Sequence, residues 1–344
     1  MSKIQLTQYS KASGCGCKIA PAQLEEILSG CTIGPQFAQL LVGNDTKDDA
    51  AVMELPDGTC IVSTTDFFMP IVDDAFDFGS IAAANAMSDI YAMGAKPLMA
   101  IAILGWPVET LSTELAQAVI NGAQAICTKA GIPLAGGHSV DAQEPFFGLA
   151  VTGVLPNAAM LKRNNTVQQG DVLYLTKPLG IGMYSAAHKR GVLSESDYHL
   201  LRTHCTTLNA IGQDLGALSY VHAMTDVTGF GLSGHLLEML ADKALTAIID
   251  KAAIPLLPAA HQFAQQFIFP NNTTRNYNAH LPFIEGMTGL DFLIYCDPQT
   301  SGGLLFSVAP AYAATLEAFL HSKQQFFAPI GTIVEAKEKK IIFQ

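Results

Sequence analysis

Residues 81–93 read IAAANAMSDIYAM, a run dominated by alanine and larger apolar residues. Alanine favours helix, and apolar residues at nearly every position predict a helix most of whose circumference is buried. Asn85 and Asp89 are four residues apart and share one face of that helix. An ionised carboxylate there costs several kcal/mol unless it is paired or binds a metal ion. Because the sequence offers few cations to pair with it, we predict that Asp89 is a metal ligand.

Short β-like runs alternate with helical patterns on both sides of this stretch. Strands are predicted over residues 60–64, 98–104 and 146–152, and a helix is predicted over residues 109–129. Gly131 and Pro133 stop that helix. A second alternation begins at Val172 and runs to Phe343. The pattern predicts an α/β protein built in two halves.

The chain divides at a polar stretch, residues 162–171, which is a plausible linker. We place a boundary near residues 156–168. The expected organisation is an N-terminal arm rich in glycine and cysteine over residues 1–45, a first domain over 46–157 and a second α/β domain over 168–344.

Composition excludes several classes of function. The chain has 344 residues, of which 49% are hydrophobic and 14% charged, so it can bury a large core. Its net charge of -11 without a basic block argues against binding to nucleic acid or to an anionic membrane. No apolar stretch is long enough to span a bilayer, and the seven scattered cysteines are typical of reduced thiols. We expect a soluble cytoplasmic protein.

The N-terminal arm contains Cys15-Gly16-Cys17-Lys18, two thiols and an ammonium group on a glycine-loosened backbone. A nearby cation stabilises a thiolate and makes the cysteine reactive. An unstructured tail with incidental cysteines explains these residues equally well. Half of a zinc site is a further alternative, although the other cysteines are scattered singly without a partner motif.

Aspartates from several segments indicate a metal–nucleotide site. Asp48 and Asp49 stand side by side before an apolar run, Asp66 follows a β-like run where a chain usually leaves a sheet, and Asp226 precedes a glycine-rich segment. Each alone is also typical of a turn or a helix cap. Because no Walker lysine motif is present and Mg²⁺ takes one or two carboxylates per ion, the set predicts a nucleotide bound through more than one Mg²⁺ ion.

Two glycine-rich segments allow other interpretations. Gly229, Gly231 and Gly234 spell G-x-G-x-x-G, and Asp250 follows about twenty residues later, which is typical of an NAD-binding oxidoreductase. Against this, a polar stretch separates the glycines from their strand, and Asp226 would repel a pyrophosphate. The second segment, residues 136–139 (GGHS), follows a β-like run and either presents N–H groups to a phosphate or forms a plain tight turn.

In combination, six motifs resemble the selenophosphate synthetases, also called selenide, water dikinases, over essentially the whole chain. The resemblance implies the two-domain fold shared with aminoimidazole ribonucleotide synthetase, of mixed α/β (α+β) class. An N-terminal sheet would form the interface of a homodimer, a C-terminal α/β domain would pack beside it, and ATP would bind across the dimer. The motifs are residues 14–18, 43–52, 64–68, 85–94, 136–139 and 225–231.

The implied reaction converts selenide, ATP and water into selenophosphate, orthophosphate and AMP, and supplies activated selenium for selenocysteine and selenouridine synthesis. By resemblance, Cys15 and Lys18 are catalytic, and Mg²⁺ is held by Asp49, Asp89 and Asp226. Another ATP enzyme of this fold, an NAD-binding oxidoreductase and a non-enzymatic selenium or metal carrier remain as alternatives. The ATP-contacting set by resemblance is Lys18, Thr46, Lys47, Asp48, Asp66 and Asp89, with Gly137, His138 and Ser139 reaching ATP bound in the partner subunit.

Overall fold

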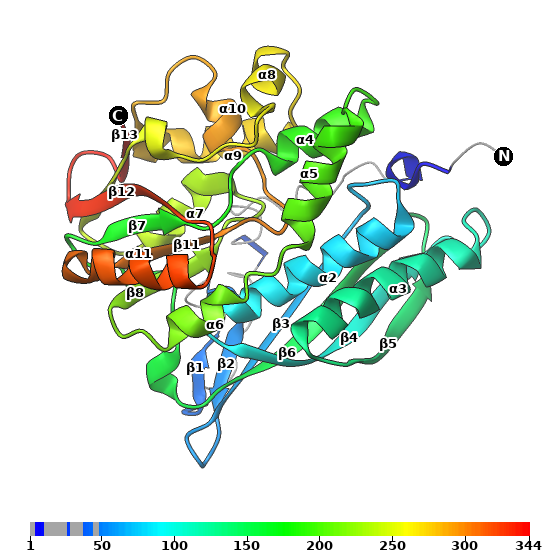
Figure 1. Cartoon of the computed structure of the whole chain (residues 1–344), viewed down its shortest axis with the longest axis horizontal. Helices are drawn as coiled ribbons and strands as arrows, with labels where there is room; N and C mark the ends of the chain where they lie inside the picture. Colours follow the sequence, from blue (N-terminus) through cyan, green and yellow to red (C-terminus); the bar gives the residue numbers. More distant parts are fainter. Residues whose placement is uncertain (1–3, 10–25, 28–36, 44–47) are drawn as a thin grey trace.

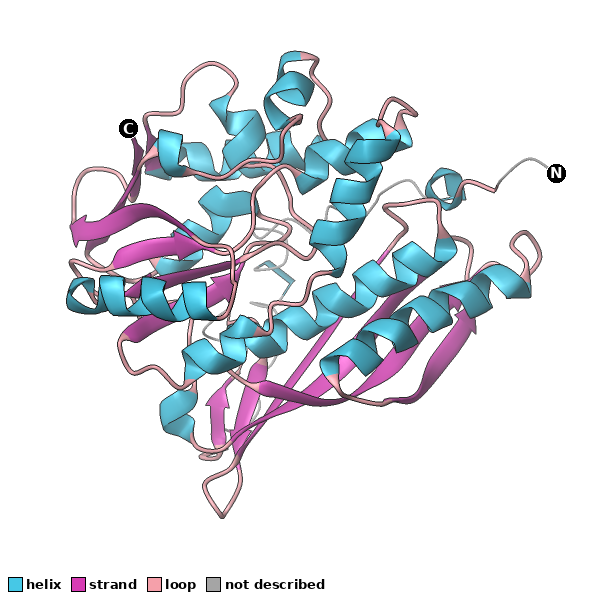
Figure 2. Ribbon diagram, in the orientation of Figure 1, coloured by secondary structure: helices cyan, strands magenta, loops and turns pink. Residues whose placement is uncertain are grey.

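A single buried helix, α2 (Ala75–Ala92), lies between the two halves of the molecule (Figures 1 and 2). The structure is a computed structural model and describes residues 4–9, 26–27, 37–43 and 48–344. Within α2 only Phe76 and Asp89 are not buried. The predicted buried helix is confirmed. Asp89, the carboxylate near its C-terminal end, is one of the two helix residues that remain accessible.

The first half is a six-stranded sheet in the order β1-β2-β3-β6-β4-β5. Its described neighbours are antiparallel except for β4 and β5, which are parallel. The strands and the helix predicted here are confirmed, and the helix ends as expected at Gly131, whose φ is 74°. The elements are β1 (Leu40–Val42), β2 (Ala51–Glu54), β3 (Cys60–Phe68), β4 (Lys96–Trp106), α3 (Thr113–Ala130), β5 (Leu134–Asp141) and β6 (Phe146–Leu155).

Helices α2 and α3 cover the same face of this sheet and approach each other closely through two glycines (Figure 1). A Cβ atom on Gly79 would lie 1.8 Å from the carbonyl oxygen of Val119, and one on Gly122 would lie 2.0 Å from that of Phe76. Both distances are far below van der Waals contact. The close crossing of the two helices therefore requires glycine, which has no side chain, at both positions.

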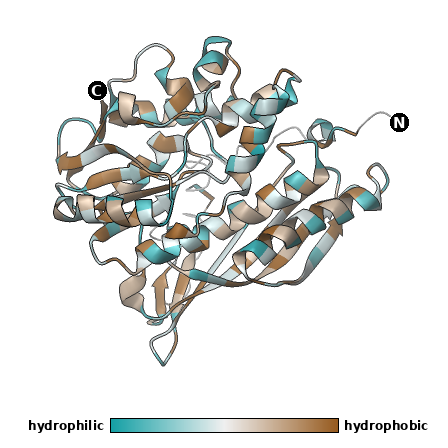
Figure 3. Cartoon of the chain, in the orientation of Figure 1, coloured by the Kyte–Doolittle hydropathy of each residue, from teal (hydrophilic) through white to brown (hydrophobic). Residues whose placement is uncertain are grey.

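The second half is a seven-stranded sheet in the order β10-β13-β9-β12-β7-β11-β8. Figure 3 shows hydrophobic colouring along the strands of this sheet, and most of its helices lie on one side in Figure 1. The strands are β7 (Val172–Leu175), β8 (Val221–Asp226), β9 (Leu245–Ile249), β10 (Ile284–Glu285), β11 (Leu304–Val308), β12 (Ala328–Glu335) and β13 (Ile341–Phe343). The helices are α4 (Ile181–Lys189), α5 (Glu195–Thr206), α6 (Ile211–Gly216), α7 (Gly231–Met239), α8 (Ala260–Gln265), α9 (Asn271–His280), α10 (Asp291–Tyr295) and α11 (Ala313–Ser322).

This topology excludes the dinucleotide interpretation of the G-x-G-x-x-G segment. A dinucleotide fold needs parallel neighbouring strands joined through the glycine-opened helix. Here β8 is antiparallel to β11, and three strands separate it from β9. Asp250, whose spacing fitted that interpretation, instead accepts a hydrogen bond from the Ala252 backbone N–H at 2.9 Å and caps a short 3-10 turn.

The two halves share one continuous hydrophobic core, and the C-terminal end of α2 is fixed against α6. A Cβ on Gly212 would lie 2.2 Å from the Tyr91 carbonyl oxygen, and one on Gly216 would lie 2.5 Å from that of Gly94. The polar stretch 162–171, predicted as a linker, does connect the sheets but is firmly packed. Its Lys162, Asn164 and Asp171 are all buried. Within the described part of the chain, no helix is long and apolar enough to cross a membrane.

Candidate functional site

Strand β3 and helix α2 are joined by two polar contacts, each of which involves one aspartate. The Thr64 hydroxyl donates to Asp89 Oδ2 at 2.6 Å, and Asn85 Nδ2 donates to Asp66 Oδ2 at 2.6 Å. Two residues along a strand span about 6.6 Å and four residues along a helix about 6 Å, so the two contacts match in spacing. The helix residues and the strand residues thereby hold one another in register.

Asp49 is the third carboxylate of this site. Its Oδ1 accepts a hydrogen bond from the Thr225 hydroxyl at 3.0 Å, which connects it to the second half of the chain. Its Oδ2 is buried and has no hydrogen-bond partner among the described residues. Such an atom is costly to bury unless a cation or donor reaches it.

Asp226, the last residue of β8, brings a fourth carboxylate to the same region and is only 1% exposed. Burial, followed by the negative charges of Asp226 and Asp89, raises the pKa of the Asp49 carboxyl well above its usual value. In the part of the chain that the structure describes, no group of three or more His, Cys, Asp or Glu side chains is placed so that it could hold a metal ion. Mg²⁺ needs only one or two carboxylates per ion when phosphates and water supply the rest.

Asp48 points differently from Asp49. Its Oδ1 accepts a hydrogen bond from the Asn164 backbone N–H at 2.8 Å, and its Oδ2 is buried without a hydrogen-bond partner among the described residues. One oxygen therefore anchors the segment that joins the two halves, while the other is available to a ligand.

Two sequence predictions about local structure are wrong. Asp66 does not follow a strand but lies within β3, paired with Leu149 of β6, because β3 is longer than its apolar pattern. Residues 136–139, for which a tight turn was one of the two interpretations, form no turn but belong to the exposed strand β5, where His138 pairs with Ile103. Three inter-strand steps separate β5 from β3, about 14 Å, so this chain does not bring Gly137, His138 and Ser139 to its own carboxylates.

Four predicted site residues, Cys15, Lys18, Thr46 and Lys47, lie outside the described residues. Their roles stay predictions.

Sequence reasoning missed three residues that orient the carboxylates or carry charge near them. Thr64 precedes Asp66 by two positions, and the two-residue period of a strand puts them on one face, a signal that could have been used. Thr225 directly precedes Asp226, but its contact with Asp49 joins residues 176 apart. Lys177 is a buried ammonium group whose pKa is affected by the charge of Asp226, and nothing in its local sequence indicates that.

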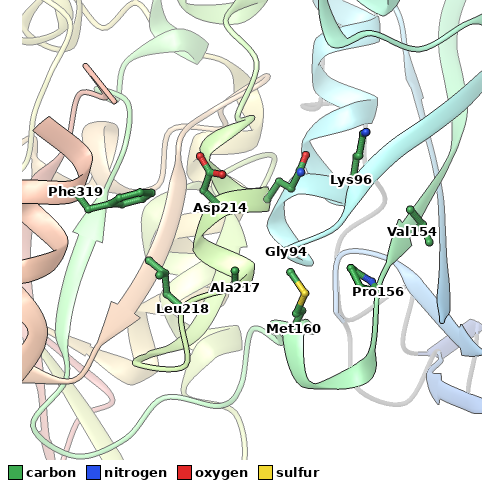
Figure 4. Close-up of a pocket in the computed structure, with 10 residues that line it drawn as sticks. Gly94, Lys96, Val154, Pro156, Met160, Asp214, Ala217, Leu218 and Phe319 are labelled. Atoms are coloured by element: carbon green, nitrogen blue, oxygen red, sulfur yellow. The ribbon is translucent and has the colours of Figure 1, made fainter. Parts of the chain in front are cut away.

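A cavity of about 400 Å³ lies elsewhere, at the junction of the two halves (Figure 4). Lys96, Met160, Asp214, Leu218 and Phe319 are among the residues that line it. None of the site carboxylates does. The polar site and this mainly apolar cavity are therefore distinct features.

Both halves of the chain match known family models. Residues 47–155 match the AIR synthase related protein, N-terminal domain, and residues 168–344 match the AIR synthase related protein, C-terminal domain. The chain therefore has the two-domain fold of the AIR synthase related proteins, as the resemblance implied.

Named relatives narrow the family assignment further. The "Selenide, water dikinase" of Colwellia psychrerythraea is 52% identical over 336 residues, which cover 98% of this chain and 97% of that protein. Those of Aeromonas salmonicida and Pseudomonas aeruginosa are each 53% identical, with 97% and 96% of this chain and 96% of each relative covered. The chain belongs to the selenide, water dikinase family.

Solved structures show the same fold at low identity. Thiamine-monophosphate kinase from Stenotrophomonas maltophilia aligns with a TM-score of 0.66 and 21% identity, covering 90% of this chain and 92% of that one. Hydrogenase maturation protein HypE in complex with ATP aligns with a TM-score of 0.65 and 16% identity, covering 90% and 87%. The two-sheet architecture is therefore shared with proteins that differ widely in sequence.

Proposed function

We propose that this chain is an ATP-dependent phosphotransferase that forms selenophosphate from selenide, ATP and water and releases AMP and orthophosphate. The observation that carries the proposal is the 52–53% identity to selenide, water dikinases over nearly the full length of both proteins. The grouping of Asp49, Asp89 and Asp226 in the fold supports it independently. The selenophosphate would supply selenocysteine and selenouridine synthesis.

The carboxylates fit Mg²⁺. Asp49 offers a buried oxygen without a hydrogen-bond partner among the described residues, and its pKa is raised first by burial and then by the negative charges of Asp226 and Asp89. We propose that Asp49, Asp89 and Asp226 hold more than one Mg²⁺ ion, because they come from three separate segments. When bound, these ions would neutralise the phosphate charges of ATP.

The protein's own part in the chemistry is orientation. Thr64, Asn85 and Thr225 each donate to one carboxylate and fix which oxygen faces the site. Asp66 and the second oxygen of Asp48 would contact ATP. We assign Lys18, Thr46 and Lys47 to ATP binding as well, because they fall in motifs of the family.

The reaction has two bond changes in sequence. Selenium attacks the γ-phosphorus of ATP, forming the Se–P bond while the γ-phosphorus–oxygen bond breaks and ADP leaves with the electron pair. Water then cleaves the remaining β-phosphate, giving orthophosphate and AMP. We propose that Cys15 and Lys18, on the arm of residues 1–45, guide selenide into the first step and keep water out of it.

We further propose a homodimer formed through the first domain, residues 46–157, with the ATP site shared across the interface. The sheet face not covered by α2 and α3 exposes Phe67, Met99, Ile101 and Val140, each between 44% and 47% exposed. Such a surface is typical of an interface. Gly137, His138 and Ser139 lie on the strand at its edge and would reach ATP in the partner subunit.

We place the enzyme in the cytoplasm. The four described cysteines, Cys60, Cys127, Cys205 and Cys296, are free and buried, which suits a reducing compartment.

The test is selenide-dependent release of AMP under anaerobic conditions. The wild type should release AMP and orthophosphate in equal amounts only when selenide, ATP and Mg²⁺ are all present. Asp226→Asn should abolish this while leaving the thermal unfolding midpoint near that of the wild type. AMP formation that does not depend on selenide would contradict the proposal.

A further inference from the structure

Lys177 is a buried lysine that no part of the proposed chemistry uses. It follows β7, is 6% exposed, and its ammonium group donates to three backbone carbonyl oxygens. The acceptors are Thr207 at 2.7 Å, Ser301 at 2.8 Å and His204 at 3.3 Å. These bonds use all three donors of the ammonium group, and Lys177 forms no ion pair with any described residue. Its positive charge is therefore fixed by carbonyl oxygens and is not neutralised by an adjacent carboxylate in the described part of the chain.

Ser301, one of the acceptors, has an unusual backbone. Its φ is 49°, in the left-handed region that costs a non-glycine residue about 1 kcal/mol or more. Its carbonyl accepts from Lys177, while its N–H donates to Asn85 Oδ1 at 2.7 Å. The left-handed conformation thus directs the N–H of the residue toward helix α2.

The contact with Ser301 decides which way the Asn85 amide points. Because Oδ1 of Asn85 accepts from the Ser301 N–H, its Nδ2 must face Asp66, to which it donates at 2.6 Å. A reversed amide would present an oxygen to the Asp66 carboxylate. An unbroken chain of hydrogen bonds therefore runs from Lys177 through Ser301 and Asn85 to Asp66.

The same turn, residues 297–303, also fixes the segment after Asp226. The Val227 N–H donates to the Gly303 carbonyl at 2.9 Å, and the Gln299 N–H donates to the Thr228 carbonyl at 2.9 Å. Asn209 donates from Nδ2 to the Gly302 carbonyl and to the Ser88 hydroxyl of α2, both at 2.8 Å. Asp66 and Asp226, from opposite halves of the protein, are thus positioned by one turn.

We infer that Lys177 is a positioning residue for the metal–nucleotide site: by holding the Ser301 carbonyl it sets the Asn85 amide against Asp66, and it places a fixed positive charge near Asp226. Burial lowers the pKa of the Lys177 ammonium to about 8, while the negative charge of Asp226 opposes that fall, so the group is mostly protonated at pH 7. The inference rests on the proposed function only for the identity of the metal–nucleotide ligand.

Lys162 provides a matched control. It is also a buried lysine, 5% exposed, whose ammonium donates to the carbonyl oxygens of Leu218 and Val221 at 2.9 Å each. Burial lowers its pKa to about 8 as well. Neither of these hydrogen bonds reaches the 297–303 turn or the site carboxylates.

The experiment compares Lys177→Met with Lys162→Met in the full-length protein. Mn²⁺ binding with a non-hydrolysable ATP analogue is followed by electron paramagnetic resonance, and the Asn85 side-chain NH₂ signal is followed in metal-free protein with ¹⁵N-labelled asparagine. Loss of a residue that orients metal ligands typically costs about 10-fold or more in metal affinity. We expect that loss, and a moved Asn85 signal, in Lys177→Met only.

If Lys177→Met bound Mn²⁺ as tightly as Lys162→Met and its Asn85 signal did not move, Lys177 would have only a structural role and the inference would be overturned. If Lys177→Met does not fold, Lys177→Gln is tested in its place with the same two readouts and the same deciding outcomes, because it removes the charge and its shorter side chain, with two N–H donors, cannot make the three carbonyl contacts of the ammonium group. The NMR signal requires no turnover, so a failure of the proposed function would leave this test intact.

Discussion

Thr64→Val is the sharpest single perturbation of the site because it exchanges a hydroxyl for a methyl group of similar size. The Thr64 hydroxyl has one proton, and its 2.6 Å contact with Asp89 Oδ2 takes it, the Asp49 carbonyl being 3.4 Å away. A hydrogen bond to a charged group contributes about 1.5–3 kcal/mol. Since about 1.4 kcal/mol is tenfold in an equilibrium constant, the Mg²⁺ concentration for half-maximal AMP release should rise about 10-fold or more.

The same loss sets the expected change in stability. At about 2.1 cal/mol/K per residue, the unfolding entropy of 344 residues is about 0.7 kcal/mol/K, so 1.5–3 kcal/mol lowers the unfolding midpoint by about 2–4 °C. Calorimetry in the presence of a chelator measures this without metal.

Thr65→Val is the matched control. Thr65 is the next residue of β3, points to the opposite face of the sheet, and only its 3.4 Å contact with the Leu149 carbonyl is lost. We expect the Mg²⁺ dependence of Thr65→Val to equal that of the wild type. If Thr64→Val shared that dependence, the account of how Asp89 is oriented would be refuted.

Three further outcomes are expected. Burial raises the pKa of Asp297 to about 8, so between about pH 4 and pH 8 the folded chain keeps a proton that the unfolded chain releases, and this group makes stability fall as pH rises. Asp297→Asn should flatten that fall in calorimetric scans, and an unchanged slope would show that the carboxyl is already ionised. Gly122→Ala places a Cβ 2.0 Å from the Phe76 carbonyl oxygen, and this overpacking against backbone should lower the free energy of unfolding by about 3 kcal/mol or more in denaturant titrations. The change Asn121→Ala at the exposed neighbouring position should leave that free energy unchanged. Equal losses in the two variants would contradict the close α2–α3 crossing. Ile101→Glu on the uncovered sheet face should give a monomer in sedimentation, with Val192→Glu, an exposed apolar position elsewhere, remaining dimeric; a dimeric Ile101→Glu would place the interface on another surface.

The sequence was informative where the signal was local. Residues 81–93 predicted the buried helix because alanine and apolar residues fill nearly every position, and the isolated carboxylate Asp89 marked the site. Asp66 was predicted as a site residue but misplaced relative to its strand, since the polar residues 63–66 interrupt the apolar pattern before Phe67 and Phe68 complete β3.

What the sequence did not reveal depends on distant partners. The Thr225–Asp49 contact spans 176 residues and the Ser301–Asn85 contact spans 216, so no window along the chain contains both members. Residues 136–139 were interpreted as either a phosphate-binding segment or a tight turn because Gly136 and Gly137 are typical of both, whereas here their positive φ values lie within a strand at a sheet edge.

The most direct test of the central claim is ³¹P NMR of the wild-type protein incubated anaerobically with ATP, Mg²⁺ and ⁷⁷Se-enriched selenide. We expect a new phosphorus signal split by coupling to selenium, growing in step with AMP and orthophosphate. ATP consumed to ADP and orthophosphate, with no selenium-coupled phosphorus signal, would contradict the claim that this chain forms selenophosphate.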